Sequence, residues 1–244
     1  MVDQLRDFAD SRLINGCIYC GGREETRDHV PSRVFLDFPL PTNLPVVPAC
    51  RACNNGFSRD EEYLACLIES VVAGSTDPDH IQRPEVADVL RRSPALRSRI
   101  EAGKRITGEQ VAFDIDQTRV RNVILKLATG HAAFELSSPC REEPSVLRWW
   151  PIPLMSEEER DSYDSAHVTQ IFGEVGSRGM QRLLVTQLTL KSPTGQSSTL
   201  GLLVNDWVEV QDGRYRYLSV DDGAEVRVKI VIREYLACEV SWAN

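Results

Sequence analysis

Two pairs of cysteines carry the clearest chemical pattern in this sequence. Cys17 and Cys20 form one C-x-x-C pair, Cys50 and Cys53 form a second, and 29 residues separate the pairs. Each pair presents two thiolates to one ion, so together they predict the tetrahedral four-sulfur shell that Zn²⁺ accepts. Such a shell leaves no open position for a substrate. We therefore expect a structural zinc ion that contributes folding free energy and takes no part in a reaction.

A second group of polar residues lies between the cysteine pairs and directly after them. Asp28 and His29 are adjacent in the intervening loop, Asn43 precedes a short apolar run, and Asn54 follows the second pair. Carboxylate and amide oxygens are hard ligands that suit Mg²⁺ or Mn²⁺. An imidazole can take a proton from water near neutral pH. These residue types in one zinc-pinned loop favour metal-assisted cleavage of a phosphodiester.

Each of these residues also has a simpler interpretation. Asp28 is a residue type common in turns and caps, and Asn43 follows a proline-rich stretch where it could simply make a turn. Asn54 or Asn55 could cap the helix expected after the second cysteine pair. Asn55 is accordingly the alternative metal ligand. His29 is the hardest of the group to explain by local structure alone.

The charge balance limits the classes of partner. Lys and Arg number 28 against 36 Asp and Glu, which gives a net charge of -8 and argues against a protein that coats nucleic acid non-specifically. Residues 1–60 carry 7 basic and 8 acidic side chains, so any contact with DNA must be local. The arginines that flank the polar residues are candidates for binding phosphates, although each could equally be a solvated charge. They are Arg27, Arg33, Arg51 and Arg59.

Hydrophobic periodicity and turn residues predict the elements that position these groups. A short helix is expected over 1–15, a strand over 44–47, and a helix from a capping box at 58–61 to Gly74. The central part predicts helices over 85–100, interrupted at Ser93-Pro94, a strand over 111–115, and a strong helix over 117–134. Residues 140–153 are rich in turn residues. Strand patterns then recur from 168 to 240.

The predicted fold class is α+β, with three segments along the chain. Residues 1–74 hold the cysteines, 75–140 form a helical connection, and 141–244 form an antiparallel β-rich domain. That last domain could serve dimerisation, target recognition or sensing of a trigger. His131, on the apolar side of its helix, and the tryptophans are expected in the core, whereas His80 and His167 have no motif around them. The basic residues of the same helix, Arg119, Arg121 and Lys126, are expected on a solvated face.

No stretch approaches the ~20 apolar residues that span a bilayer. The first residues lack the apolar core of a signal peptide. We therefore expect a soluble, cytoplasmic protein, in which paired cysteines indicate metal binding rather than disulfides.

The order of the motifs resembles a known family. C-x-x-C, then D-H-x-x-P, then N-L before a strand, then C-x-x-C-N is similar to the zinc-containing HNH endonucleases of ββα-metal fold, over roughly residues 15–70. The resemblance implies that His29 is the general base and that Asn43 orients its ring. It implies that Asp28 and Asn54 hold the catalytic metal. Asn rather than His at the last position favours Mg²⁺ or Mn²⁺.

The resulting hypothesis is a metal-dependent endonuclease that hydrolyses DNA, with RNA as an alternative substrate. Arg27, Arg51 and Arg59 are its candidate substrate-binding residues. By analogy with other nucleases of this type, a role in bacterial defence or as a toxin effector would fit, with a homodimer or partner protein formed through the C-terminal domain. The competing hypothesis is a non-catalytic zinc-knuckle module that binds nucleic acid or protein.

Overall fold

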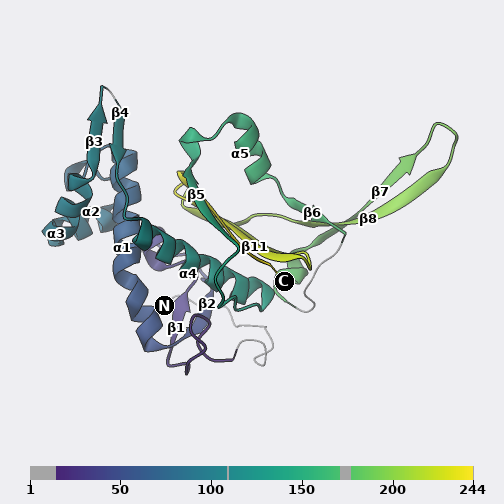
Figure 1. Ribbon diagram of the computed structural model, residues 1–244, viewed down its shortest axis with the longest axis horizontal. Helices are drawn as coiled ribbons and strands as arrows, with labels where there is room; N and C mark the ends of the chain where they lie inside the picture. Colours follow the sequence, from purple (N-terminus) through teal and green to yellow (C-terminus); the bar gives the residue numbers. More distant parts are fainter. Residues whose placement is uncertain (1–14, 109, 171–176, 244) are drawn as a thin grey trace.

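The computed structural model describes residues 15–108, 110–170 and 177–243 (Figure 1). The helix predicted over 1–15 falls almost wholly outside these residues. Within them, a small β-pair and a long helix are followed by a helical region and then by a C-terminal antiparallel sheet. The α-helices are α1 (Arg51–Ala73), α2 (Pro84–Arg92), α3 (Pro94–Ala102), α4 (Gln117–Leu136) and α5 (Glu157–Asp164).

The cysteine-rich segment folds as two strands followed by a helix. Strand β1 (Thr26–His29) pairs antiparallel with β2 (Val46–Ala49), and α1 begins two residues after β2. The predicted start of this helix at the capping box of residues 58–61 was wrong. Cys50 is the N-cap instead, and its Sγ accepts a hydrogen bond from the backbone N–H of Cys53 at 3.3 Å. The sulfur takes the place of the side-chain oxygen that usually accepts this bond at an N-cap, so the helix starts at Arg51.

The predicted end of α1 at Gly74 is confirmed. Gly74 adopts the left-handed conformation, with φ at 62°, that favours glycine after a helix. The predicted interruption at Ser93-Pro94 is also confirmed, because it separates α2 from α3. A small hairpin of β3 (Lys104–Thr107) and β4 (Gln110–Phe113) follows, close to the strand predicted at 111–115.

Helix α4 connects the two halves of the molecule. It packs on α1 and on three strands of the C-terminal sheet, β10 (Tyr215–Asp221), β11 (Glu225–Ile232) and β12 (Leu236–Ala243), and nearly its whole length from Val123 onward is buried. A glycine inside a helix costs about 1 kcal/mol relative to alanine, and here close approach explains it. A Cβ at Gly130 would lie 2.7 Å from Cγ2 of the buried Val30, directly after β1. The glycine therefore lets α4 lie against the β1–β2 pair.

The C-terminal sheet is antiparallel with strand order β5-β12-β11-β10-β9. Residues 146–151 were predicted as part of a turn-rich stretch, which was wrong. They form β5, which pairs with β12 from Pro151 opposite Leu236 to Val146 opposite Ser241. Pairing with a strand almost a hundred residues away overrides the local turn preference. The strands are β5 (Val146–Pro151), β9 (Val208–Gln211), β10 (Tyr215–Asp221), β11 (Glu225–Ile232) and β12 (Leu236–Ala243).

A second sheet has the order β6-β8-β7 and extends from the body as a long two-stranded ribbon (Figure 1). Strand β6 pairs only with residues 203–205 of β8, so the rest of the ribbon has two strands. Its strands are β6 (His167–Thr169), β7 (Leu184–Lys191) and β8 (Ser197–Asn205).

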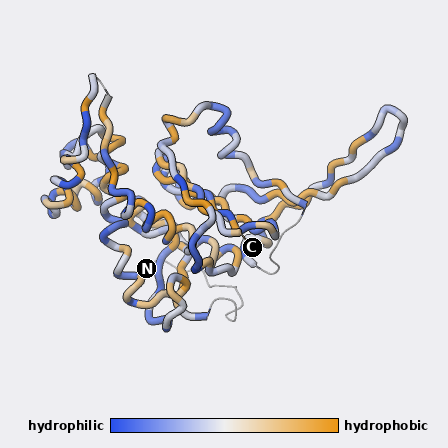
Figure 2. Tube along the Cα trace, in the orientation of Figure 1, coloured by the Kyte–Doolittle hydropathy of each residue, from blue (hydrophilic) through white to orange (hydrophobic). Residues whose placement is uncertain are grey.

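The main core lies where α1 and α4 meet the C-terminal sheet, and Figure 2 shows hydrophobic segments converging there. Its buried residues run from Phe35 to Trp242, so all three predicted segments contribute to one core. The tryptophans pack as expected, with Trp149 beside the main core and Trp150 and Trp207 around Tyr163. The mixture of helices and antiparallel sheets confirms the α+β class. None of the described helices has the length and apolar character needed to span a membrane.

Candidate functional site

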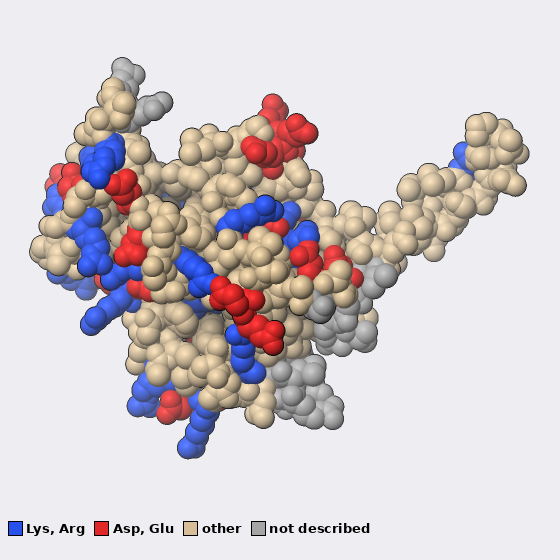
Figure 3. All heavy atoms as spheres, in the orientation of Figure 1, with Lys and Arg blue, Asp and Glu red and all other residues tan. Residues whose placement is uncertain are grey.

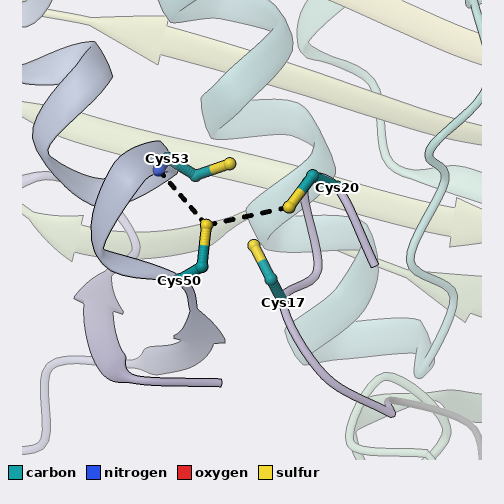
Figure 4. A group of neighbouring side chains, drawn as sticks. All are labelled: Cys17, Cys20, Cys50 and Cys53. Atoms are coloured by element: carbon teal, nitrogen blue, oxygen red, sulfur yellow. Dashed lines mark hydrogen bonds between the residues drawn. The ribbon is translucent and has the colours of Figure 1, made fainter. Parts of the chain in front are cut away.

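The four cysteines of the two pairs come together as predicted (Figure 4). Cys17 and Cys20 lie in the turn before β1, and Cys50 and Cys53 lie at the start of α1. Their sulfur atoms all lie within 4.8 Å of one another, and the Sγ atoms of Cys20 and Cys50 are 3.7 Å apart. A tetrahedral shell with Zn–S bonds of about 2.3 Å places its sulfurs about 3.8 Å apart. The cluster therefore fits a structural Zn²⁺.

Backbone N–H groups around the turn of Cys17 and Cys20, called here the first knuckle, favour the thiolate form of Cys17. Burial raises the pKa of the Cys17 thiol, but hydrogen bonds from the backbone of Cys50, Cys20 and Tyr19 outweigh burial and lower this pKa to about 7. A thiolate is the form that binds metal. The knuckle closes with a hydrogen bond from the N–H of Cys17 to the carbonyl of Gly22 at 2.7 Å.

Arg141, which follows α4 in the chain, binds the backbone of the turn that contains Cys17 and Cys20. Its guanidinium donates hydrogen bonds to the carbonyl oxygens of Asn15, Cys17 and Ile18 at 3.1 to 3.2 Å. The position of the first cysteine pair is thus fixed partly by a residue more than a hundred positions away. No pattern in the sequence marked this arginine.

Asp28 is buried, with 7% of its surface exposed, and one of its oxygens is held by two donors. Oδ2 accepts a hydrogen bond from the Tyr19 hydroxyl at 2.8 Å and an ion pair from Nζ of Lys126 at 2.9 Å. Lys126 is only 2% exposed, so its prediction as part of a solvated helix face was wrong. Its ammonium also donates to Ser32 Oγ and Glu61 Oε1, both at 2.6 Å.

This network shapes the electrostatics beside the β1–β2 pair. Two carboxylates, Asp28 and Glu61, share one buried ammonium, which leaves a net negative charge that favours a further cation. Among the described residues, Oδ1 of Asp28 has no hydrogen-bond partner, whereas Oδ2 has two. The carboxylate is therefore held in one orientation with one oxygen free to bind a ligand.

His29 directly follows Asp28 at the end of β1 and is half-buried. Burial lowers the pKa of its imidazole, the positive charge of Arg33 lowers it further, and Asp28 partly opposes both effects. Within the described part of the chain, the ring of His29 makes no hydrogen bond. A neutral imidazole without a partner among the described residues can accept a proton from water.

No hydrogen bond links Asn43 to His29 in the part of the chain that the structure describes. Asn43 is exposed, and its side chain makes no hydrogen bond to any described residue. Its φ of 65° is the left-handed conformation that asparagine tolerates in turns. The geometry thus matches the simpler interpretation of Asn43 as a turn residue, since no contact supports the ring-orienting role implied by the resemblance.

Asn54 lies in the first turn of α1 and faces β1. Its Nδ2 donates to Oγ1 of Thr26 and to the carbonyl oxygen of Arg27, each at 3.2 Å. These bonds fix the amide next to Asp28 and leave its Oδ1 without a partner among the described residues. Asn55 is exposed, its backbone carbonyl accepts a bond from the Ser58 hydroxyl, and no hydrogen bond links its side chain to β1 among the described residues. Asn54 is therefore the better placed of the two amides.

The flanking arginines are exposed and available. Within the described residues, none of their guanidinium groups takes part in an ion pair. Figure 3 shows Lys and Arg atoms standing out along the lower edge of the molecule, where Figure 1 places the first turns of α1 and the β1–β2 pair. The exposed arginines at issue are Arg27, Arg33, Arg51 and Arg59.

The other predicted histidines lie outside this site. The prediction that His131 is a core residue is confirmed, because it is fully buried, its Nε2 lies 2.8 Å from the Tyr215 hydroxyl, and its ring stacks on Tyr217. His80 is exposed, and its Nδ1 lies 3.3 Å from the Ser75 hydroxyl. His167 lies near Asp222, with 3.7 Å between Nε2 and Oδ2.

Sequence reasoning missed the residues that support Asp28. One signal for Lys126 was present, because it is a single charge inside the apolar run from Val123 to Ala128 of a helix that is buried nearly all round. Tyr19, Ser32, Glu61 and Arg141 carried no comparable signal.

In comparisons with known proteins, no protein family, curated protein or solved structure matches this chain significantly.

Proposed function

We propose that the β1–β2–α1 unit is a metal-dependent nuclease site that hydrolyses phosphodiester bonds, most simply those of DNA. One observation carries the proposal. Among the described residues, the Asp28 carboxylate is held by Tyr19 and Lys126 through Oδ2 alone, and the next residue along β1, His29, has a ring that makes no hydrogen bond. Oδ1 of Asp28 is not among the fully buried polar atoms of the described residues, so it is open to a ligand from solvent.

The residues take distinct roles in this mechanism. His29 accepts the proton of the attacking water, because its imidazole is the one nearby base without a partner in the described structure. Asp28 Oδ1 and Asn54 Oδ1 would hold a divalent ion, for which oxygen ligands suit Mg²⁺ or Mn²⁺. Such an ion, when bound, supplies neutralisation of the charge that develops on the phosphate and leaving oxygens. The zinc cluster fixes the knuckles and performs no chemistry.

Lys126 acts in this proposal as a positioning residue. Its ammonium holds Asp28 through Oδ2, as outer partners of a metal-binding carboxylate commonly do. It also ties β1 to Glu61 on α1, the helix that carries Asn54. The two oxygens assigned to the ion therefore belong to elements that the same ammonium holds together.

Substrate contact would come from the exposed arginines rather than from the net charge of the protein. Arg27, Arg51 and Arg59 carry planar guanidinium groups that can donate two hydrogen bonds to one phosphate. Because the protein as a whole is acidic, we expect weak binding that falls steeply with added salt.

The test is cleavage of supercoiled plasmid with Mg²⁺ or Mn²⁺. We expect nicking or linearisation by the wild type, and loss of activity in His29→Ala and Asp28→Asn. His80→Ala is the matched control, because His80 is an exposed histidine away from the site, and it should cleave normally. If the folded, zinc-loaded wild type cleaves no DNA or RNA, or if His29→Ala remains fully active, the proposed mechanism is wrong.

One observation favours a second candidate function, a zinc-organised module that binds without cleaving. Asp28 is already paired with the Lys126 ammonium, and no hydrogen bond joins Asn43 to His29 among the described residues. That function predicts nucleic-acid or protein binding that is unchanged in His29→Ala and independent of Mg²⁺. A filter-binding assay on the same variants, run beside the plasmid assay, separates the two candidates.

A further inference from the structure

One face of the β7–β8 ribbon carries most of its leucines, and the outer part of the other face is polar. Residues directly opposite in an antiparallel pair lie on the same face, and every second residue along a strand returns to it. Leu184 faces Val204, Leu188 faces Leu200, and Thr186 faces Leu202 across the ribbon. The other face carries Val185 and Leu203 near the base of the ribbon, and farther out Gln187, Thr189, Lys191 and their partners Gly201, Thr199 and Ser197.

The apolar face is open to solvent in the single chain. The exposed fractions are 64% for Leu184, 46% for Leu188, 56% for Leu190 and 36% for Leu200. Figures 1 and 2 show why: the ribbon extends away from the body, so no described element lies over it. A two-stranded ribbon without a covering layer is marginally stable in water. Its apolar face therefore indicates a partner surface.

The charge of the ribbon restricts what that partner can be. Residues 183–205 carry a single charged side chain, Lys191 next to the turn, and Figure 3 shows the ribbon almost free of charged atoms. Nucleic acid is disfavoured, because its affinity for proteins depends on lysines and arginines that replace counterions. A strongly charged protein surface would also lose solvation without gaining ion pairs. The partner surface must be uncharged, apolar and flat.

We propose that the partner is the same ribbon of a second copy of this chain. Two copies associate about a two-fold axis, with the leucine-rich faces of their ribbons packed against each other. Such an interface is self-complementary, as closed dimers require. Packed sheets lie about 10 Å apart, a distance that interdigitating leucines fill.

The size of the ribbon sets the expected strength of association. Eight residues of strand span about 27 Å, and two strands with their side chains are roughly 10 Å wide, so each copy offers on the order of 300 Å². A standard stable interface buries about 800 Å² from each partner. We therefore expect a weak, concentration-dependent dimer, and this inference does not depend on the proposed nuclease activity.

The test is sedimentation equilibrium of the full-length, zinc-loaded chain from low to high micromolar concentration. Leu188→Lys places a charge on the apolar face, and Thr189→Lys places the same charge one residue along on the polar face. The wild type and Thr189→Lys should dimerise with dissociation constants within threefold of each other, and Leu188→Lys should remain monomeric. Circular dichroism and zinc content should be unchanged in both variants, because both positions are exposed.

A cysteine pair of variants tests the geometry directly. Under mild oxidation, Leu188→Cys should form an intermolecular disulfide readily, whereas Thr189→Cys should form little. A wild type that stays monomeric throughout the concentration range would overturn the proposal. Equal loss of dimer in the two lysine variants would overturn it as well. That result would indicate association through the edge of β7, where a charge on either face of the ribbon has the same effect.

Discussion

The β1–β2 pair and the C-terminal sheet both pack against α4, but they are stabilised by different means. The pair covers a small apolar cluster in which Val30 and Val47 meet Phe134. The sheet contributes whole rows of buried residues, such as Val226, Val228 and Ile230 of β11, to the main core. The difference indicates that metal ligation and polar contacts stabilise the β1–β2 pair, whereas apolar burial stabilises the C-terminal sheet.

Helix α4 shows the same contrast along its length. On the side toward β1, the Lys126 ammonium pairs with Asp28, and the helix backbone at Gly130 lies close to Val30. Toward the sheet it presents His131, which contacts the Tyr215 hydroxyl and stacks on Tyr217. Four perturbations test the comparison, from the largest expected effect to the smallest.

Removal of zinc should have the largest effect, and it should be confined to one region. Structural zinc sites bind with about 10–16 kcal/mol of apparent free energy, which exceeds what the small cluster under β1–β2 can replace. Chelation, or Cys50→Ser, should expose the amides of β1 and β2 to hydrogen exchange while those of β10 to β12 stay protected. Cys140→Ser, at a cysteine outside the cluster, is the control. Equal loss of protection in both regions would contradict the comparison.

Lys126→Met should destabilise the protein by about 3–5 kcal/mol, because it leaves the Asp28 and Glu61 carboxylates buried without their cation. The measurement is urea denaturation at neutral pH. Lys104→Met, on the small β3–β4 hairpin, should change stability by less than about 0.5 kcal/mol. Adding Asp28→Asn to Lys126→Met should recover part of the loss. A Lys126→Met protein as stable as the wild type would show that the network contributes no stability.

Acidification should weaken the contact between α4 and the sheet through His131. Burial holds the pKa of His131 well below its usual value, so the folded protein keeps this ring neutral. Below about pH 6.5 the unfolded chain binds a proton that the folded chain does not, and stability falls by up to about 1.4 kcal/mol per pH unit. Above that pH the contribution is fully present.

The His131→Gln variant isolates this effect from other titrating groups. Gln can still bond to the Tyr215 hydroxyl but does not titrate. The difference in unfolding free energy between wild type and variant should therefore shrink as pH falls from 7 to 5. A difference that stays constant with pH would rule out a neutral, buried His131 as its source.

Gly130→Ala should have the smallest effect, about 1–2 kcal/mol of destabilisation. The gain in helix propensity is about 1 kcal/mol, but the new Cβ would meet the stiff, fully buried side chain of Val30. The double variant with Val30→Ala should regain stability relative to Gly130→Ala alone. Thermal unfolding of the single and double variants measures both, and a Gly130→Ala protein more stable than the wild type would contradict the close approach.

Local patterns in the sequence were sufficient to predict the elements whose structure is set by residues close together in the chain. The C-x-x-C spacing predicted the four-thiol cluster, because each pair by itself can present two sulfurs to one ion, although Arg141 also helps to fix the first pair. Gly74 predicted the end of α1, Ser93-Pro94 predicted the break between α2 and α3, and helical periodicity predicted α4. The antiparallel nature of the C-terminal strands followed from their short length and turn residues.

Tertiary structure decided what depends on partners far away in the sequence. Residues 146–151 became a strand because β12 pairs with them, and the start of α1 moved to Arg51 because Cys50 caps it. Lys126, expected in solvent, is buried because Asp28 and Glu61 lie against it. The sequence by itself thus determined the metal cluster and the polar residues offered for chemistry. Only the packing of α4 on β1 decided which oxygen of Asp28 is free, since that depends on contacts between segments about a hundred residues apart.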